Sequence, residues 1–116
     1  MISKLVGLIK NITFYERFAF IETLDNRYYK LIRYSLSCPS GYDTKAWKEA
    51  VKDFINRKEE ISLVIGKDNK PYVAVPNRKV NAKERTIVLI TGIKMIEVSE
   101  TDVMEILIKG FSEKET

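Results

Sequence analysis

The stretch RFAFIE at residues 17–22 decides how this chain is expected to fold. Successive side chains of a β-strand point to opposite faces, so Phe18 and Phe20 share one face. Ala19 and Ile21 share the other. In one arrangement the smaller pair enters the core and both rings stand in water; in the other, the rings form the core. Exposed neighbouring rings are costly unless something flat covers them, so the first arrangement, which we favour, predicts a stacking surface.

Strand patterns flank this stretch on both sides and predict a meander of three antiparallel strands. The expected strands cover residues 4–14, 18–24 and 27–36. Gly7 lies inside the apolar pattern of the first strand, so we expect a bulge or bend there. Asp25-Asn26 has the composition of a hairpin tip between the second and third strands.

A helix is expected after the break at residues 38–41. Asp43 or Thr44 can cap its first turn, and the pattern ends near Arg57-Lys58. Apolar residues recur at helical spacing: Trp47, Ala50, Val51, Phe54 and Ile55. This stripe is typical of a helix that packs on a sheet, so we interpret Trp47 as a core anchor rather than as a partner for bases.

The second half of the chain predicts further strands and a terminal helix. A strand at 61–66 is followed by a short extended piece at 71–75, where the proline favours an edge position. Residues 76–84 form a polar loop, and residues 85–98 a strand kinked at Gly92. Ser99 caps a helix at 99–110. We expect one domain over residues 1–111 and a frayed tail at 112–116.

The order β-β-β-α-β-β defines a mainly β fold with helices. It suits a five-stranded Greek-key barrel of the OB type, followed by a C-terminal helix. In such barrels the second and third strands, with the loops between strands 1 and 2 and between strands 4 and 5, form the ligand surface. The aromatic stretch at 17–22 and the polar loop at 76–84 occupy those regions of the expected fold.

The composition narrows the classes of function. The 116-residue chain contains no histidine and one cysteine, Cys38. This disfavours hydrolase triads, zinc sites and a disulfide framework. No stretch is long and apolar enough to span a membrane, and the N-terminal residues show no signal peptide, so we predict a cytoplasmic protein. The abundance of Lys, Glu and Ile is typical of a thermophilic source.

The distribution of charge favours a polyanionic partner. The net charge of the chain is +4. Residues 1–96 hold 18 Lys and Arg against 10 Asp and Glu, a net charge of +8, whereas residues 97–116 hold 2 against 6, a net charge of −4. A basic body attracts nucleic acid, although ordinary solubilising surface charge has the same composition.

Five residues carry a resemblance to a known family. Gly7, Lys10, Phe18, Phe20 and Ile21 have the same relative spacing as in the cold-shock domain pattern. In that family the glycine and lysine open the first strand, and the two rings face outward. The resemblance implies that these rings stack on single-stranded bases.

The chain also departs from that family. The family has an aromatic residue in place of Asn11 and glycines in place of Arg17 and Ala19, and its second aromatic motif is not reproduced at residues 28–34. It also lacks a long helix between its third and fourth strands. The order of elements is more similar to single-stranded-DNA-binding proteins of the OB class, which favours DNA over RNA as the ligand.

Two orientations are open for the third strand. In the first, which we favour, Tyr28 and Lys30 lie beside the phenylalanine pair, where a cation next to exposed rings fits bases on a phosphate backbone. In the second, Tyr28 and Ile32 enter the core, while Tyr29 and Arg33 face solvent. Neither face of this strand is cleanly apolar, so the pattern alone leaves both open.

Two loops are expected to extend the ligand surface. Tyr15 and Arg17 would clamp one end of the ligand, and the loop before the last strand would form a basic arm across the groove, with a solvated loop as the alternative. The predicted nucleic-acid-binding residues are Lys10, Tyr15, Arg17, Phe18, Phe20, Tyr28, Lys30, Arg78, Lys79, Lys83 and Arg85.

The leading functional hypothesis is non-catalytic, largely sequence-independent binding of single-stranded nucleic acid, without cofactor or metal. It rests on the aromatic face and the basic body, which supply base stacking and phosphate contacts. The alternative is a protein-interaction or oligomerisation module, for example a homodimer. In that case the apolar terminal helix pairs with another chain through Met104, Ile108 and Phe111.

An enzyme is the third hypothesis. Its most plausible form is a metal-dependent nuclease that uses Glu22, Asp25 and Lys30 near the aromatic face. Cys38 lacks a histidine to activate it, so we interpret it as a small buried or loop thiol rather than as a nucleophile.

Overall fold

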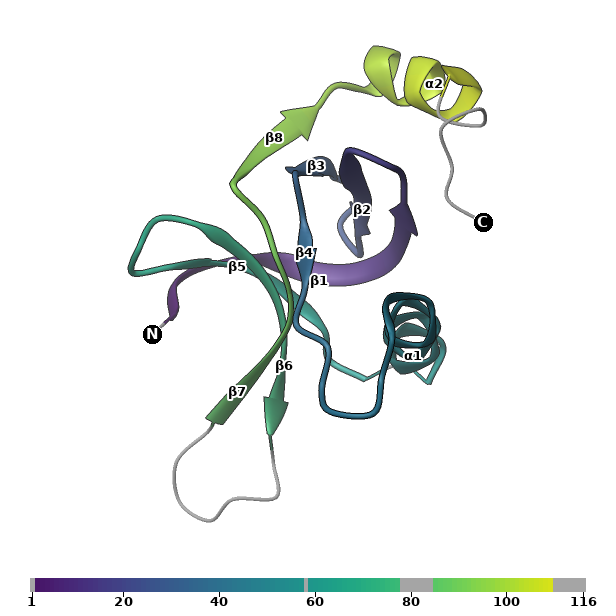
Figure 1. Ribbon diagram of the computed structural model, residues 1–116. Coiled ribbons are helices and arrows are strands. Elements are labelled where there is room, and N and C mark those ends of the chain that lie inside the picture. Colours follow the sequence, from purple (N-terminus) through teal and green to yellow (C-terminus); the bar gives the residue numbers. More distant parts are fainter. Residues whose placement is uncertain (1, 58, 78–84, 110–116) are drawn as a thin grey trace.

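The computed structural model describes residues 2–57, 59–77 and 85–109, which form a mainly β fold with two helices (Figure 1). Eight antiparallel strands make one open sheet in the order β4-β7-β6-β5-β1-β2-β3-β8. The strands are β1 (Ile2–Phe14), β2 (Phe18–Thr23), β3 (Tyr28–Ile32), β4 (Ser35–Leu36), β5 (Ser62–Gly66), β6 (Pro71–Asn77), β7 (Arg85–Thr91) and β8 (Lys94–Val98). The helices are α1 (Thr44–Asn56) and α2 (Glu100–Lys109).

The main core lies between the two halves of this sheet. It collects buried side chains from β1, β2 and β3 on one side, from β5, β6 and β7 on the other, and from α1. Its fully buried members include Ile12, Ile21, Leu31, Leu63, Val73 and Leu89. Trp47 of α1 belongs to this core, and its Nε1–H donates to the carbonyl oxygen of Leu89 at 3.0 Å. The prediction of Trp47 as a core anchor is confirmed.

Strand β1 joins the two halves because it is long and bent (Figure 1). Its first part, up to Leu8, pairs with β5, and its second part, from Ile9, pairs with β2. The register with β5 shifts between Leu5 and Gly7, at the predicted bulge. A Cβ on Gly7 would lie 3.3 Å from Cγ2 of Thr23. Glycine therefore lets neighbouring backbone and side chain approach closely at the bend.

Two of the predicted strands are interrupted. Residues 27–36 divide into β3 and β4 around Arg33, whose φ of 44° lies in the left-handed region that interrupts a strand. Residues 85–98 divide into β7 and β8 around Gly92, so the predicted kink there is confirmed.

The two interruptions face each other. Ile32 pairs with Lys94 on one side of them, and Ser35 pairs with Thr91 on the other. Between these pairs the Ile93 N–H donates to the carbonyl oxygen of Ile32 at 3.0 Å. We call residues 28–36 the β3–β4 run and residues 85–98 the β7–β8 run. The two runs pair antiparallel in one register, which is the same before and after the breaks.

The expected five-stranded barrel needs correction. Residues 2–57, 59–77 and 85–109 form eight strands, and no closed barrel is found among them. The extended piece at Pro71 was expected at an edge, but β6 lies between β5 and β7. Pro71 is the first residue of β6, a position where a strand tolerates the missing N–H.

Both helices begin where the sequence predicts. Asp43 is the N-cap of α1, and its Oδ1 accepts the Ala46 N–H at 2.7 Å. Ser99 precedes α2, and its Oγ accepts the Asp102 N–H at 3.3 Å. The predicted capping chemistry is therefore confirmed at both helices, because each cap satisfies an N–H that the helix itself leaves unpaired.

Replacing Gly92 with alanine is expected to lower the free energy of unfolding by about 1–3 kcal/mol, the usual cost of overpacking a core. A Cβ at Gly92 would lie 2.5 Å from Cδ1 and 2.6 Å from Cγ of Leu31, which is fully buried. Urea denaturation measures the change. The control Gly7→Ala meets its neighbour at 3.3 Å and is expected to cost less. A Gly92→Ala variant as stable as the parent protein would contradict this account.

Candidate nucleic-acid interface

The faces of β2 and β3 that enter the main core are the ones that we predicted from the sequence. Ala19 and Ile21 of β2 are fully buried in the main core, and Tyr29 and Leu31 of β3 are buried beside them. The alternative orientations, with the phenylalanines or Tyr28 in this core, are therefore wrong. The phenylalanine pair lies on the opposite face of the sheet.

We call the opposite face of β2, β3 and β8 the outer face. Cross-strand pairing aligns its residues in three rows, which are Glu22-Tyr28-Val98, Phe20-Lys30-Ile96 and Phe18-Ile32-Lys94. Aromatic, aliphatic and cationic side chains thus lie side by side. Sequence reasoning missed Lys94 and Ile96, because their place depends on the register between β3 and β8, which no local pattern fixes.

Helix α2 covers part of the outer face, and the sequence did not predict this. The chain enters α2 directly after β8 (Figure 1). Val103 and Ile106 of α2 pack with Tyr15, Phe20 and Val98 in a second cluster of buried residues, separate from the main core. Phe20 is 6% exposed, so the expectation that both rings stand in water is wrong for this ring. Phe20 is covered by protein side chains, both aliphatic and aromatic, rather than by solvent.

Four rings on and beside the outer face form two pairs, which together we call the aromatic group. The centroid of Tyr15 lies 5.0 Å from that of Phe18, and Phe20 stacks on Tyr28 at 5.8 Å with an interplanar angle of 11°. Phe18 and Tyr28 are half-buried at the border of the second cluster. Lys30 places its Nζ 4.8 Å from the centroid of Phe18, within the range of a cation–π interaction. Phe18, Tyr28 and Lys30 are therefore the accessible members of the group.

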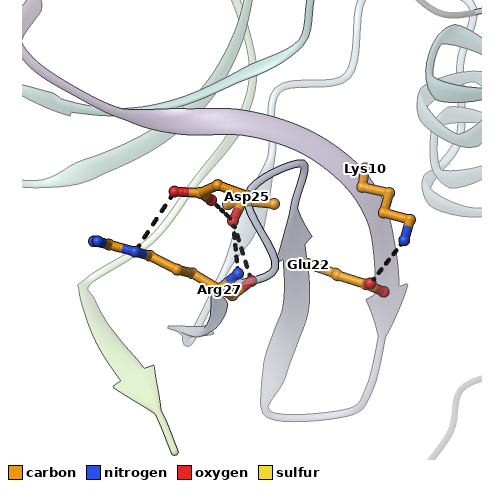
Figure 2. Close-up of polar contacts among 5 residues, drawn as sticks. Lys10, Glu22, Asp25 and Arg27 are labelled. Carbon is orange, nitrogen blue, oxygen red and sulfur yellow. Dashed lines mark hydrogen bonds and ion pairs between the residues drawn. The ribbon is translucent and has the colours of Figure 1, made fainter.

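The charged residues around the β2–β3 hairpin form two separate groups (Figure 2). Nζ of Lys10 lies 3.4 Å from Oε2 of Glu22. Nε of Arg27 lies 3.5 Å from Oδ2 of Asp25, and Oδ1 of the same carboxylate accepts a hydrogen bond from the Thr23 hydroxyl. Lys10 was predicted to contact nucleic acid. Its charge is shared with Glu22, so a phosphate would have to compete with that carboxylate.

The nuclease hypothesis requires carboxylates that gather around a metal. Glu22 and Asp25 instead have separate cationic partners. In the part of the chain that the structure describes, no group of three or more His, Cys, Asp and Glu residues is placed to hold a metal ion.

The turn after β1 is anchored by residues that follow β3. Tyr34 donates its hydroxyl hydrogen to the carbonyl oxygen of Tyr15 at 2.8 Å, and the Arg33 N–H donates to the carbonyl oxygen of Arg17 at 2.9 Å. Tyr15 is buried, and burial raises the pKa of its phenol. Arg17 is exposed. Of the two residues predicted to clamp the ligand, only Arg17 is accessible. Tyr15 is buried and its ring packs against that of Phe18.

A cation of α1 also contacts aromatic rings near this turn. Nζ of Lys48 lies 5.3 Å from the centroid of Phe14 and 5.5 Å from that of Tyr34. Loss of solvation, with a smaller contribution from the neighbouring charge of Lys52, lowers the pKa of Lys48. The sequence placed Lys48 on the polar face of the helix, and its contact with the rings depends on how α1 packs against the sheet.

The predicted basic arm stays a prediction. Arg78, Lys79 and Lys83 lie outside the described residues. Arg85 begins β7, where its backbone pairs with Asn77.

Comparison of the chain with protein families, curated proteins and solved structures found no match. Among residues 2–57, 59–77 and 85–109, neither helix has the length and apolar character needed to cross a membrane. The function is therefore argued from the outer face itself.

Proposed function

We propose that this chain is a cytoplasmic, non-catalytic protein that binds single-stranded nucleic acid on its outer face, with DNA favoured over RNA. The observation that carries the proposal is the Phe18 ring, half-buried and accessible, with Nζ of Lys30 4.8 Å from its centroid. A base stacked on Phe18 would place its phosphates beside Lys30, so one ring and one cation serve the same nucleotide. Lys94 is exposed and lies in the same row as Phe18, and Arg17, which precedes Phe18 in the chain, is also exposed.

We propose that the open sheet curves into an OB-like arrangement, which is only partly closed, for this binding mode. Two features support it. β1 bends and pairs with strands of both sheet halves, and the β3–β4 and β7–β8 runs pair in one continuous register. In the OB type, the second and third strands present the ligand surface, as β2 and β3 would here.

The chemistry of this face favours unpaired bases of any sequence. Every base has a flat π surface, so stacking on Phe18 discriminates little between bases. A base must leave its duplex before it can stack on a protein ring, and single strands are therefore expected to bind more tightly than duplexes.

A titration of labelled oligothymidylate across a salt series tests the proposal. Fluorescence anisotropy is expected to show an affinity that falls with a log–log slope of about −0.7 for each phosphate that the protein neutralises. A duplex of the same length is expected to bind more weakly, and an RNA strand to bind less tightly than DNA. No measurable binding at low salt would overturn the proposal.

A second candidate function is self-association through α2. Three apolar side chains of this helix point to solvent: Met104 is 61%, Leu107 49% and Ile108 71% exposed. Neighbouring exposed apolar side chains of this kind are typical of an interaction surface. Light scattering of the parent protein and of a Met104→Gln, Ile108→Gln variant tests it. A homodimer that becomes a monomer in the variant supports the function, and a parent protein that is monomeric throughout excludes it.

A further inference from the structure

We propose that α2 is a displaceable cover of the stacking surface, which occupies the aromatic group in the free protein and leaves it when single-stranded bases bind. This inference rests on the proposed function, because it assigns a regulation to the same face. It explains why rings whose sequence pattern resembles a base-binding surface are shielded by the protein's own C-terminal helix.

The cover is attached by few side chains. Among its described side chains, only Val103 and Ile106 are buried, and both belong to the second cluster rather than to the main core. Removing α2 from the outer face would therefore leave the main core intact. The apolar area that these two side chains bury against the sheet is small compared with the apolar area buried in the main core.

The chain geometry allows α2 to move as a unit. β8 ends at Val98, and α2 begins at Glu100, so no sheet pairing involves the helix. Its first turn is closed by Ser99, whose carbonyl oxygen accepts the Val103 N–H at 3.0 Å. A rotation of the backbone near Ser99 would carry the helix away and preserve every strand pair of β3 with β8.

The surface under the cover has the chemistry that bases require. Phe20 and Tyr28 are nearly parallel, at an angle of 11°, and Tyr15 and Phe18 form a second pair with centroids 5.0 Å apart. In the docked state Tyr15 and Phe20 are buried in one cluster with Val103 and Ile106 of α2, and Phe18 and Tyr28 pack against that cluster. Bases can replace aliphatic groups on a ring, because both cover the apolar face and the bases add stacking.

The charge of the cover opposes simultaneous binding of a nucleic acid. Glu100, Asp102 and Glu105 lie on the exposed part of α2. A phosphate backbone that approached Phe20 would meet both the helix and its carboxylates, so the docked and ligand-bound states compete. The apparent dissociation constant then equals the intrinsic one divided by the fraction of molecules in which α2 has left the face.

A matched pair of variants tests the cover. Val103→Gln with Ile106→Gln removes the two buried attachments and leaves the net charge unchanged. This variant is expected to bind oligothymidylate at least about tenfold more tightly than the parent protein, which corresponds to about 1.4 kcal/mol. The control Leu5→Gln with Ile87→Gln makes the same kind of change at two exposed apolar side chains outside α2 and is expected to bind like the parent. Equal affinity of the first variant and the parent would overturn the cover and leave the proposed function standing; no binding by either would overturn the proposed function.

Hydrogen exchange of the parent protein provides a test that does not depend on the variants folding. The amides of α2 are expected to exchange faster when saturating oligothymidylate is present, while amides of β5 and β6 keep their protection. Unchanged or slower exchange in α2 on binding would show that the helix stays in place, and would overturn the proposal. A near-ultraviolet circular dichroism spectrum checks that the main core of each variant is intact.

Discussion

A Trp47→Ala variant is expected to lose about 3–5 kcal/mol of unfolding free energy, the usual range for truncating a large buried aromatic side chain. Trp47 is 5% exposed, and its ring contacts Tyr42 and Phe54 at centroid distances of 5.2 and 6.3 Å. Domains of this size unfold with a free energy of about 5–15 kcal/mol, so the variant is expected to be close to unfolding. Urea denaturation followed by circular dichroism measures the loss.

Two further variants separate the causes of this loss. Trp47→Phe keeps most of the ring but removes the N–H that donates to the Leu89 carbonyl at 3.0 Å. That carbonyl still accepts the Ser37 N–H at 3.0 Å, so the loss of one of its two hydrogen bonds is expected to cost about 0.5–1.5 kcal/mol. Tyr42→Ala removes an exposed ring that contacts the tryptophan and is expected to have a smaller effect. A Trp47→Ala variant no less stable than Tyr42→Ala would show that α1 does not anchor the core in this way.

Combined replacement of Phe18 by alanine and Lys30 by glutamine is expected to weaken oligothymidylate binding by about tenfold to a hundredfold. Stacking on one ring contributes about 1–3 kcal/mol per base, and each 1.4 kcal/mol is a factor of ten in affinity. The loss of the Lys30 charge is also expected to make the salt slope shallower. Anisotropy titrations at two salt concentrations measure both changes.

The control for this experiment removes the same kinds of group from another place. Tyr42→Ala with Lys70→Gln deletes one exposed ring and one exposed cation away from the outer face, and it changes the net charge equally. It is expected to bind nearly as well as the parent. If the two double variants lose the same affinity, the outer face is not the binding site. Phe20→Ala is a poor probe, because Phe20 is buried under α2 and its loss also disturbs packing.

Features that depend on neighbouring residues could be predicted from the sequence. Alternation along RFAFIE placed Ala19 and Ile21 in the main core, because side-chain direction in a strand follows a period of two residues. Capping residues located the starts of both helices for a similar reason, since Asp43 and Ser99 bond to amides three residues away.

Features that depend on distant residues could not be predicted in the same way. The burial of Phe20 requires α2, which lies some eighty positions later in the chain, to pack on β2, and no local pattern encodes that docking. The order of the eight strands has the same origin. Pro71 predicted a strand at the edge of the sheet. Because Pro71 is only the first residue of β6, the strand can still pair with both β5 and β7. Strand alternation therefore placed the phenylalanine pair on the outer face, but it could not predict that α2 buries Phe20.

The shared alignment of the β3–β4 and β7–β8 runs constrains how evolution can alter the length of this protein. One residue inserted within β3 would shift the pairing of β3 with β8 or that of β4 with β7 by one position. Side chains that face the core in the shifted part would then face solvent, and the reverse. At Arg33 and Ile93 the backbone already departs from regular pairing. Natural variants are therefore expected to gain or lose residues at these two points or at hairpin tips such as Asn26, and to keep the strands between them at constant length.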